Sequence, residues 1–71
     1  MKINTIEYFG APVNMVIVDN CLAIGRITSK TYLVESVFSN ECYLDVCTDE
    51  EILLNYGVNV KEISYFNKLD V

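Results

Sequence analysis

Residues 31–54 read TYLVESVFSNECYLDVCTDEEILL, and this stretch contains two strand patterns followed by the start of a helix. Residues 31–38 and 42–48 are rich in aromatic and β-branched side chains, which is typical of strands. The residues between them, Ser39, Asn40 and Glu41, predict a hairpin loop. With a loop of this length, one face of the hairpin holds Tyr32, Val34, Phe38, Cys42, Leu44 and Val46.

The same register places Glu35 and Asp45 opposite one another on the outer face of the hairpin. Like charges in directly opposed positions repel each other. Three explanations are open: the pairing is shifted by one residue, solvent tolerates the repulsion, or a cation lies between the two carboxylates.

The hairpin is followed by the signature of a helix N-terminus. Thr48 is the expected N-cap residue and Glu51 occupies the third helical position, which together form a capping box. Asp49 and Glu50 place negative charge in the first turn, where it interacts favourably with the helix dipole. Gly57 is suited to the position after the helix. The sequence predicts a helix of about two turns, too short to be stable without packing, and its contacts with the sheet are expected from Ile52, Leu53 and Tyr56.

Toward the N-terminus, residues 3–9 predict a strand with Ile6 and Tyr8 on one face, followed by a turn at Pro12. Residues 13–18 and 21–27 predict a hairpin closed by Asp19 and Asn20. This second register pairs Val16 with Ala23, so one face holds Val13, Met15, Ile17, Leu22 and Ile24, and the other holds Val16, Val18, Cys21 and Ala23. Because both faces are apolar, we expect a helix or another subunit to cover the second one.

Residues 58–66 predict a last strand with a bulge near Lys61 and Glu62, and residues 67–71 predict a frayed tail. A chain of 71 residues makes one domain at most. Residues 1–71 therefore predict a single α+β domain, with a small antiparallel sheet of about five strands and one short helix. An SH3-like, partly closed β-barrel is the alternative.

The composition excludes several functional classes. Binding nucleic acid requires clustered Lys and Arg, but the net charge is −5 and the five basic residues are spread over the chain. Direct nucleic-acid binding is therefore not expected, and binding to an anionic membrane is disfavoured for the same reason. The absence of histidine excludes histidine-based catalysis, and the glycines form no phosphate-binding loop. The sequence predicts no enzyme and no cofactor.

The three cysteines are expected to be reduced, because their number is odd and no export signal is apparent. On a straight strand Cys42 and Cys47 point to opposite faces, so they do not bridge each other. No histidine is present to complete a zinc site, and no metal site is predicted. The apolar segments are too interrupted for a signal peptide or a membrane span, which favours a cytoplasmic location.

Between Lys30 and Lys61 the sequence has no basic residue but six acids. A negative face selects positive partners. We therefore expect a non-enzymatic protein-binding module, a small acidic inhibitor or modulator that docks on a basic surface of a partner protein, of the kind that bacteriophages and mobile elements encode. The candidate contact residues are Glu35, Glu41, Tyr43, Asp45, Asp49, Glu50 and Glu51.

Two alternatives remain open. In the first, the acids only keep a small protein soluble. In the second, the chain is a structural or assembly subunit that forms a homo-oligomer, such as a homodimer, through an apolar sheet face. The second alternative follows from an apolar content of 52%, which is high for a chain with so little interior.

Overall fold

The computed structural model describes residues 2–68. Five strands come first: β1 (Ile3–Tyr8), β2 (Ala11–Asp19), β3 (Leu22–Arg26), β4 (Thr31–Phe38) and β5 (Glu41–Thr48). Three helical elements follow: α1 (Asp49–Tyr56), the 3₁₀ turn η1 (Val60–Glu62) and α2 (Ser64–Lys68). The strands form one antiparallel sheet in chain order, with β1 and β5 at its edges. The α+β prediction is confirmed, and the sheet is open rather than barrel-like.

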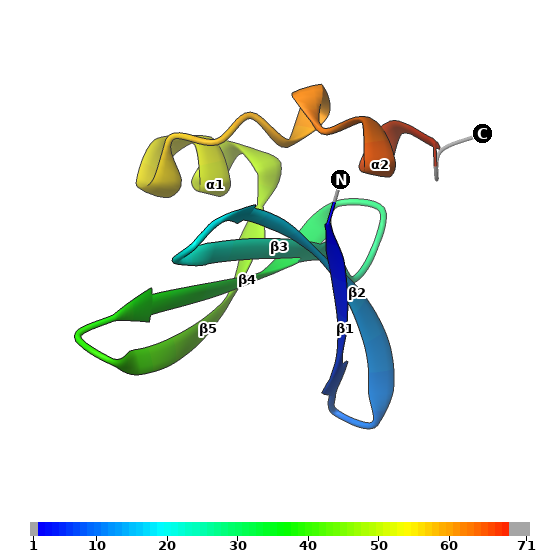
Figure 1. Ribbon diagram of the computed structural model, residues 1–71. Coiled ribbons are helices and arrows are strands. Elements are labelled where there is room, and N and C mark those ends of the chain that lie inside the picture. Colours follow the sequence, from blue (N-terminus) through cyan, green and yellow to red (C-terminus); the bar gives the residue numbers. More distant parts are fainter. Residues whose placement is uncertain (1, 69–71) are drawn as a thin grey trace.

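The sheet is strongly bent, so that the β1–β2 hairpin and the β4–β5 hairpin extend in different directions, while α1, η1 and α2 lie together over one face (Figure 1). We call this the helix-covered face and the opposite one the open face. The core of the helix-covered face consists of Val16, Ile24, Tyr32, Val34, Cys47, Ile52, Val60 and Phe66. On the open face the bend itself buries a second cluster, formed by Val13, Met15, Ala23 and Leu33. The two apolar faces of β2–β3 are thus covered within one chain.

The predicted register of the β2–β3 hairpin is wrong by one residue. Val16 pairs with Ile24 rather than with Ala23, and the register shifts between Ile17 and Asp19. The loop consists of Asn20 and Cys21, because the Asp19 side chain accepts a hydrogen bond from the Cys21 backbone N–H at 2.7 Å. A shift of one residue exchanges the two faces of a strand. Leu22 and Ile24 therefore lie on the helix-covered face with Val16, and Ala23 lies on the open face with Met15.

The β4–β5 hairpin has a two-residue loop instead of three. Ser39 and Asn40 adopt positive φ angles of 53° and 64°, the conformation of a type I′ turn, whose twist matches that of the strands it joins. Phe38 therefore pairs with Glu41, and Glu35 pairs with Leu44. Of the three explanations for the opposed acids, the shift by one residue is the one observed. Consequently Leu44 and Val46 are not core residues, and both are about half exposed, at 50% and 46%.

The prediction for α1 is confirmed in its limits and caps. The Thr48 hydroxyl accepts a hydrogen bond from the Glu51 N–H at 3.3 Å, and a Glu51 carboxylate oxygen accepts one from the Thr48 N–H at 2.9 Å. Gly57 ends the helix with a φ of 71°, and its N–H donates to the Leu53 carbonyl. Ile52 is fully buried and Tyr56 packs against the same cluster. Leu53 was expected to pack on the sheet, but it is 53% exposed.

The predicted last strand over residues 58–66 is wrong, because η1 and the start of α2 occupy most of this segment. The Asn59 side chain caps η1 by accepting a hydrogen bond from the Lys61 N–H at 3.1 Å. Val60, Ile63 and Phe66 recur every third residue and all contact the core, a helical spacing rather than the alternation of a strand. Of the predicted tail, Asn67 belongs to α2, and residues 69–71 lie outside the described residues.

Candidate protein-binding surface

Strand β5 presents three of the predicted contact residues side by side. Glu41, Tyr43 and Asp45 alternate along the strand on the helix-covered face, and all three are exposed. The Tyr43 hydroxyl donates a short hydrogen bond to the Glu41 carboxylate, which holds the ring beside that acid. This end of the strand is exposed because the helical elements cover the sheet mainly near Cys47, where β5 enters the core.

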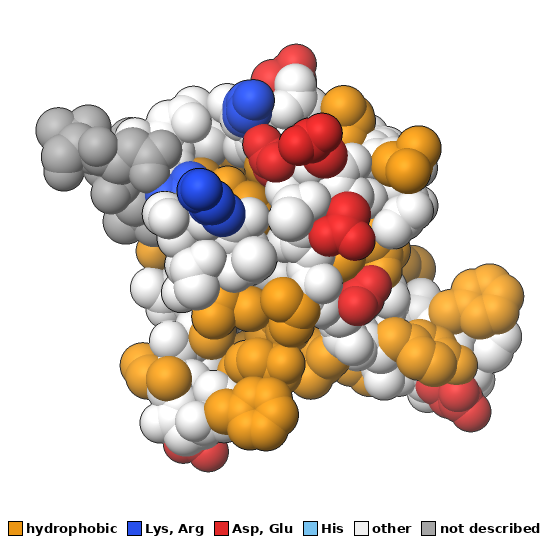
Figure 2. Space-filling model, turned by 180° about the vertical axis from the view of Figure 1, so that it is seen from behind, with side chains coloured by type: hydrophobic (Ala, Val, Ile, Leu, Met, Phe, Trp, Pro, Cys, Tyr) orange, Lys and Arg blue, Asp and Glu red, His pale blue; other side chains and the backbone are white. Residues whose placement is uncertain are grey.

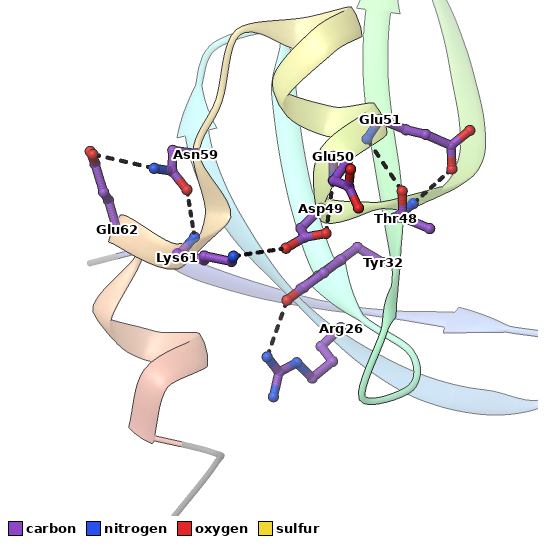
Figure 3. A network of polar contacts seen from close by, with 9 residues as sticks. All are labelled: Arg26, Tyr32, Thr48, Asp49, Glu50, Glu51, Asn59, Lys61 and Glu62. Atoms are coloured by element: carbon purple, nitrogen blue, oxygen red, sulfur yellow. Dashed lines mark hydrogen bonds and ion pairs between the residues drawn. The ribbon is translucent and has the colours of Figure 1, made fainter.

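Three of the four remaining predicted acids, Asp49, Glu50 and Glu51, lie at the start of α1 (Figure 3). Glu51 is held by the capping box described above. Asp49 accepts a hydrogen bond from the Glu50 N–H at 2.8 Å and forms an ion pair with Lys61, with 3.7 Å between carboxylate oxygen and Nζ. The side chains of Asp49 and Lys61 are 34% and 78% exposed, so solvent and salt weaken their attraction.

Cys47 lies where the two groups of acids meet. Its buried thiol donates to an Asp45 carboxylate oxygen at 3.3 Å. Burial raises the pKa of this thiol to about 11, with further contributions from the hydrogen bond to Asp45 and from the charges of Asp45 and Glu51. Asp45 of the strand group and Glu51 of the helix group therefore both lie near the Cys47 thiol. We name the acids Glu41, Asp45, Asp49, Glu50 and Glu51 the acidic strip.

The pKa values of two phenols beside the strip are raised, each by burial and by a different neighbouring carboxylate. The hydrogen bond to Glu41 raises the pKa of Tyr43, with burial contributing less. Burial raises the pKa of Tyr56, followed by the charge of Asp45, while a hydrogen bond with Ser36 opposes the shift. The carboxylates act in the same direction on both phenols because they disfavour a second negative charge nearby.

Among the described side chains, positive charge lies at one end of the acidic strip. Lys61 is paired with Asp49, and Lys30 lines a shallow pocket of about 210 Å³ together with Asp49 and Glu50. Arg26 instead lies over the ring of Phe66, and its Nη2 donates to the Tyr32 hydroxyl at 3.1 Å. Figure 2 shows acidic side chains in a broken row, with basic side chains beside its upper end.

Away from that end the acids are not neutralised. In the part of the chain that the structure describes, Glu41, Asp45 and Glu51 form no ion pair with a lysine or arginine. All three are exposed. The acidic strip therefore has an uncompensated section along β5 and the first turn of α1.

Glu35 is the predicted contact residue that does not join the strip. Its pairing with Leu44 places it on the open face, whereas Asp45 pairs with Val34 on the helix-covered face. There a Glu35 carboxylate oxygen accepts a hydrogen bond from the Cys42 thiol at 3.3 Å. This hydrogen bond raises the pKa of Cys42, with burial and the Glu35 charge contributing less.

Sequence reasoning missed the exposed apolar side chains of the open face. Val37, Leu44 and Val46 are 43–50% exposed on neighbouring strands, and Val46 pairs with the buried Leu33. Figure 2 shows apolar side chains over a continuous area between the two hairpins. Assigning a two-residue turn to Ser39 and Asn40 would have revealed this surface, because that turn sets the register of the hairpin.

Comparisons with protein-family models, with curated proteins and with solved structures found no match. Among the helices of residues 2–68, none has both the length and the apolar character needed to cross a bilayer. In the same residues, no group of three or more Cys, Asp or Glu side chains is placed to hold a metal ion.

Proposed function

We propose that this domain is a non-enzymatic protein-binding module that docks on a basic surface of a partner protein through its acidic strip. The observation that carries the proposal is the uncompensated section: Glu41 and Asp45 on β5 and Glu51 in the first turn of α1 are exposed and form no ion pair with a basic residue among the described residues. Tyr43 lies between two of these acids and is 48% exposed. Tyrosine is enriched among the residues that dominate interface energies.

Electrostatic complementarity of this kind mainly affects association rate and specificity. Exposed charges are screened over about 10 Å at 0.1 M salt, so binding through the acidic strip should weaken as salt is added. A partner site that normally binds an anion would be blocked by the docked carboxylates. The proposed role is therefore inhibition or modulation of such a partner in the cytoplasm, as expected of a small protein encoded by a bacteriophage or another mobile element.

The test is capture of a partner from lysate by the immobilised protein at low and at high salt. In the first variant, which we call the strip variant, Glu41→Gln, Asp45→Asn and Glu51→Gln remove three charges from the acidic strip and retain the side-chain shapes. Glutamine also preserves the capping box at position 51. We expect the captured protein to be released at high salt and to be lost with this variant.

A matched variant, which we call the control variant, has the same total charge as the strip variant. Glu7→Gln, Asp19→Asn and Glu62→Gln also remove three charges, but from exposed positions on β1, β2 and η1. This control should still capture the partner. If both variants capture it equally well, or if high salt releases nothing, docking through the acidic strip is wrong.

A homo-oligomer is the second candidate function, and the exposed Val37, Leu44 and Val46 favour it. Two copies that pack these side chains together would remove apolar surface from water. Sedimentation velocity over a range of protein concentrations tests this candidate, with Leu44→Lys as the variant expected to dissociate the oligomer. A wild-type protein that sediments as a monomer at every concentration eliminates it.

A further inference from the structure

Strand β5 is an uncovered edge of the sheet. It pairs with β4 through eight consecutive residue pairs without a register shift, and residues 41–46 are all exposed. In an antiparallel ladder, every second residue of an edge strand directs its N–H and C=O away from the neighbouring strand. Natural edge strands are commonly protected by lysine, proline, a bulge or a covering element. β5 contains no lysine or proline, and α1 begins only at Asp49.

The two faces of this edge differ in chemistry. The helix-covered face of β5 carries Glu41, Tyr43 and Asp45, and the open face carries Cys42, Leu44 and Val46. A strand added beside β5 places its side chains within about 4.5–5.5 Å of their cross-strand neighbours. Its residues would meet acids on one face and apolar side chains on the other, in strict alternation.

We propose that the free edge of β5 pairs with an extended segment of a partner protein in which basic and apolar residues alternate. The backbone groups of the segment would bond to those of β5, its Lys or Arg side chains would lie beside Glu41 and Asp45, and its apolar side chains would cover Leu44 and Val46. In this mode of recognition, hydrogen bonds between the two backbones supply affinity and the alternating side chains supply specificity. The inference rests on the proposed function, because it specifies the form of the basic surface that the acidic strip recognises.

Charge distinguishes this occupant from a second copy of the chain. A second β5 paired edge to edge would bring another Glu41 and Asp45 onto the same surface, where like charges repel. A basic strand instead neutralises these carboxylates while covering the same apolar residues. The acids of β5 thus oppose self-pairing and favour a cationic strand.

The experiment uses two synthetic peptides of identical composition, titrated into the full chain at low salt. In the first, acetyl-Lys-Val-Lys-Val-Arg-Val-Lys-Val-amide, basic and apolar residues alternate. In the second, the four basic residues precede the four valines. We expect the alternating peptide to bind at least about tenfold more tightly, a difference that corresponds to the loss of only one or two good contacts. Hydrogen exchange should show new protection of alternate β5 amides in residues 41–46.

Two N-methylated forms of the alternating peptide test backbone pairing directly. One form is methylated at two odd-numbered residues and the other at two even-numbered residues, which blocks one set of peptide N–H groups without changing the side chains. Only the form whose methyl groups face β5 should lose binding. Equal effects of the two forms, or equal binding of the alternating and block peptides, would refute strand pairing.

The outcomes separate this inference from the proposed function. If the block peptide binds as well as the alternating one while the strip variant still loses its captured partner, docking stands and edge pairing is wrong. If the strip variant binds the alternating peptide as tightly as wild type does, the claim that basic side chains of the segment lie beside Glu41 and Asp45 is wrong. Sedimentation of the free protein as a dimer that the peptide does not dissociate would assign the edge to a second copy.

Discussion

Gly25 of β3 pairs with Met15 of β2 and leaves no space for a side chain. A Cβ atom at this position would lie 2.5 Å from the Met15 sulfur, 2.6 Å from a Val13 methyl carbon and 2.9 Å from the Asn14 carbonyl oxygen. Met15 is fully buried, so neither it nor the backbone has space to yield. The bend that buries the open-face cluster therefore depends on the absence of a side chain at position 25.

Gly25→Ala should lower the free energy of unfolding by about 1–3 kcal/mol, the usual cost of overpacking a core. Urea denaturation followed by circular dichroism measures the loss. The control is Asn4→Ala on the exposed part of β1, which should change stability by less than about 0.5 kcal/mol. Equal stability of the two variants would contradict the close approach at Gly25.

Cys47 should make stability depend on alkaline pH. Its pKa rises from 9.0 to about 11 in the folded state, mainly because of burial. The folded protein therefore holds this proton more tightly than the unfolded chain does. The free energy of unfolding should be insensitive to this group at neutral pH and should decrease as pH rises from 9 to 11.

Cys47→Ala removes the titrating thiol and isolates its effect from that of the tyrosines. Denaturation of both proteins at a series of pH values should show that the free energy of unfolding decreases more steeply at alkaline pH for wild type. The smaller side chain of the variant lowers its stability equally at every pH and does not change this slope. Parallel curves for wild type and variant would show that the Cys47 thiol has the same pKa in the folded and the unfolded protein.

At the scale of elements, the capping box fixes where α1 begins and thereby places Glu51 beside the end of β5. Thr48→Ala removes the hydroxyl that accepts from the Glu51 N–H, and it should cost about 1 kcal/mol. Thr48→Ser keeps the oxygen and should stay within a few tenths of wild type. Urea midpoints of the three proteins test this, and a serine variant as unstable as the alanine variant would mean that lost packing, not capping, is responsible.

The C-terminal segment stabilises the sheet through Phe66. This side chain is 1% exposed, and its ring packs against Tyr32 with 5.3 Å between ring centroids. Phe66→Ala should cost about 3–5 kcal/mol, a large part of the stability of so small a domain. Leu54→Ala, on a side chain that is 84% exposed, should have almost no effect. Comparable melting temperatures for the two variants would exclude the packing of this segment described above.

At the scale of the whole molecule, a net charge of −5 opposes the compact state. Raising NaCl from about 0.02 to 0.5 M should increase the free energy of unfolding, because screening shortens the range of repulsion. The rise should be smaller for the strip variant than for the control variant that also lacks three charges. An equal rise in both would mean that the acids of β5 and α1 are not concentrated enough to repel one another.

The local signals of this sequence were predictable because each depends on residues close together in the chain. The capping box of Thr48 and Glu51 and the C-terminal glycine of α1 involve contacts over three or four residues, and both are confirmed. The strands and the α+β class followed from short apolar segments separated by turn residues. Residues 58–66 were misread because Val58, Val60, Ile63 and Tyr65 also fit a strand with a bulge.

What the sequence determined by itself is the five strands, the first helix and the excess of carboxylates. Which acids share a surface depended on the strand registers set by the Ser39–Asn40 turn and by the shift between Ile17 and Asp19. A change of one residue in such a register moves every side chain of the strand to the opposite face of the sheet. Those registers separated Glu35 from Asp45 and exposed Leu44. Backbone conformation in the turns, together with burial against the helices, selects one register among several that the side-chain pattern allows, so only the tertiary structure fixes the faces of β5.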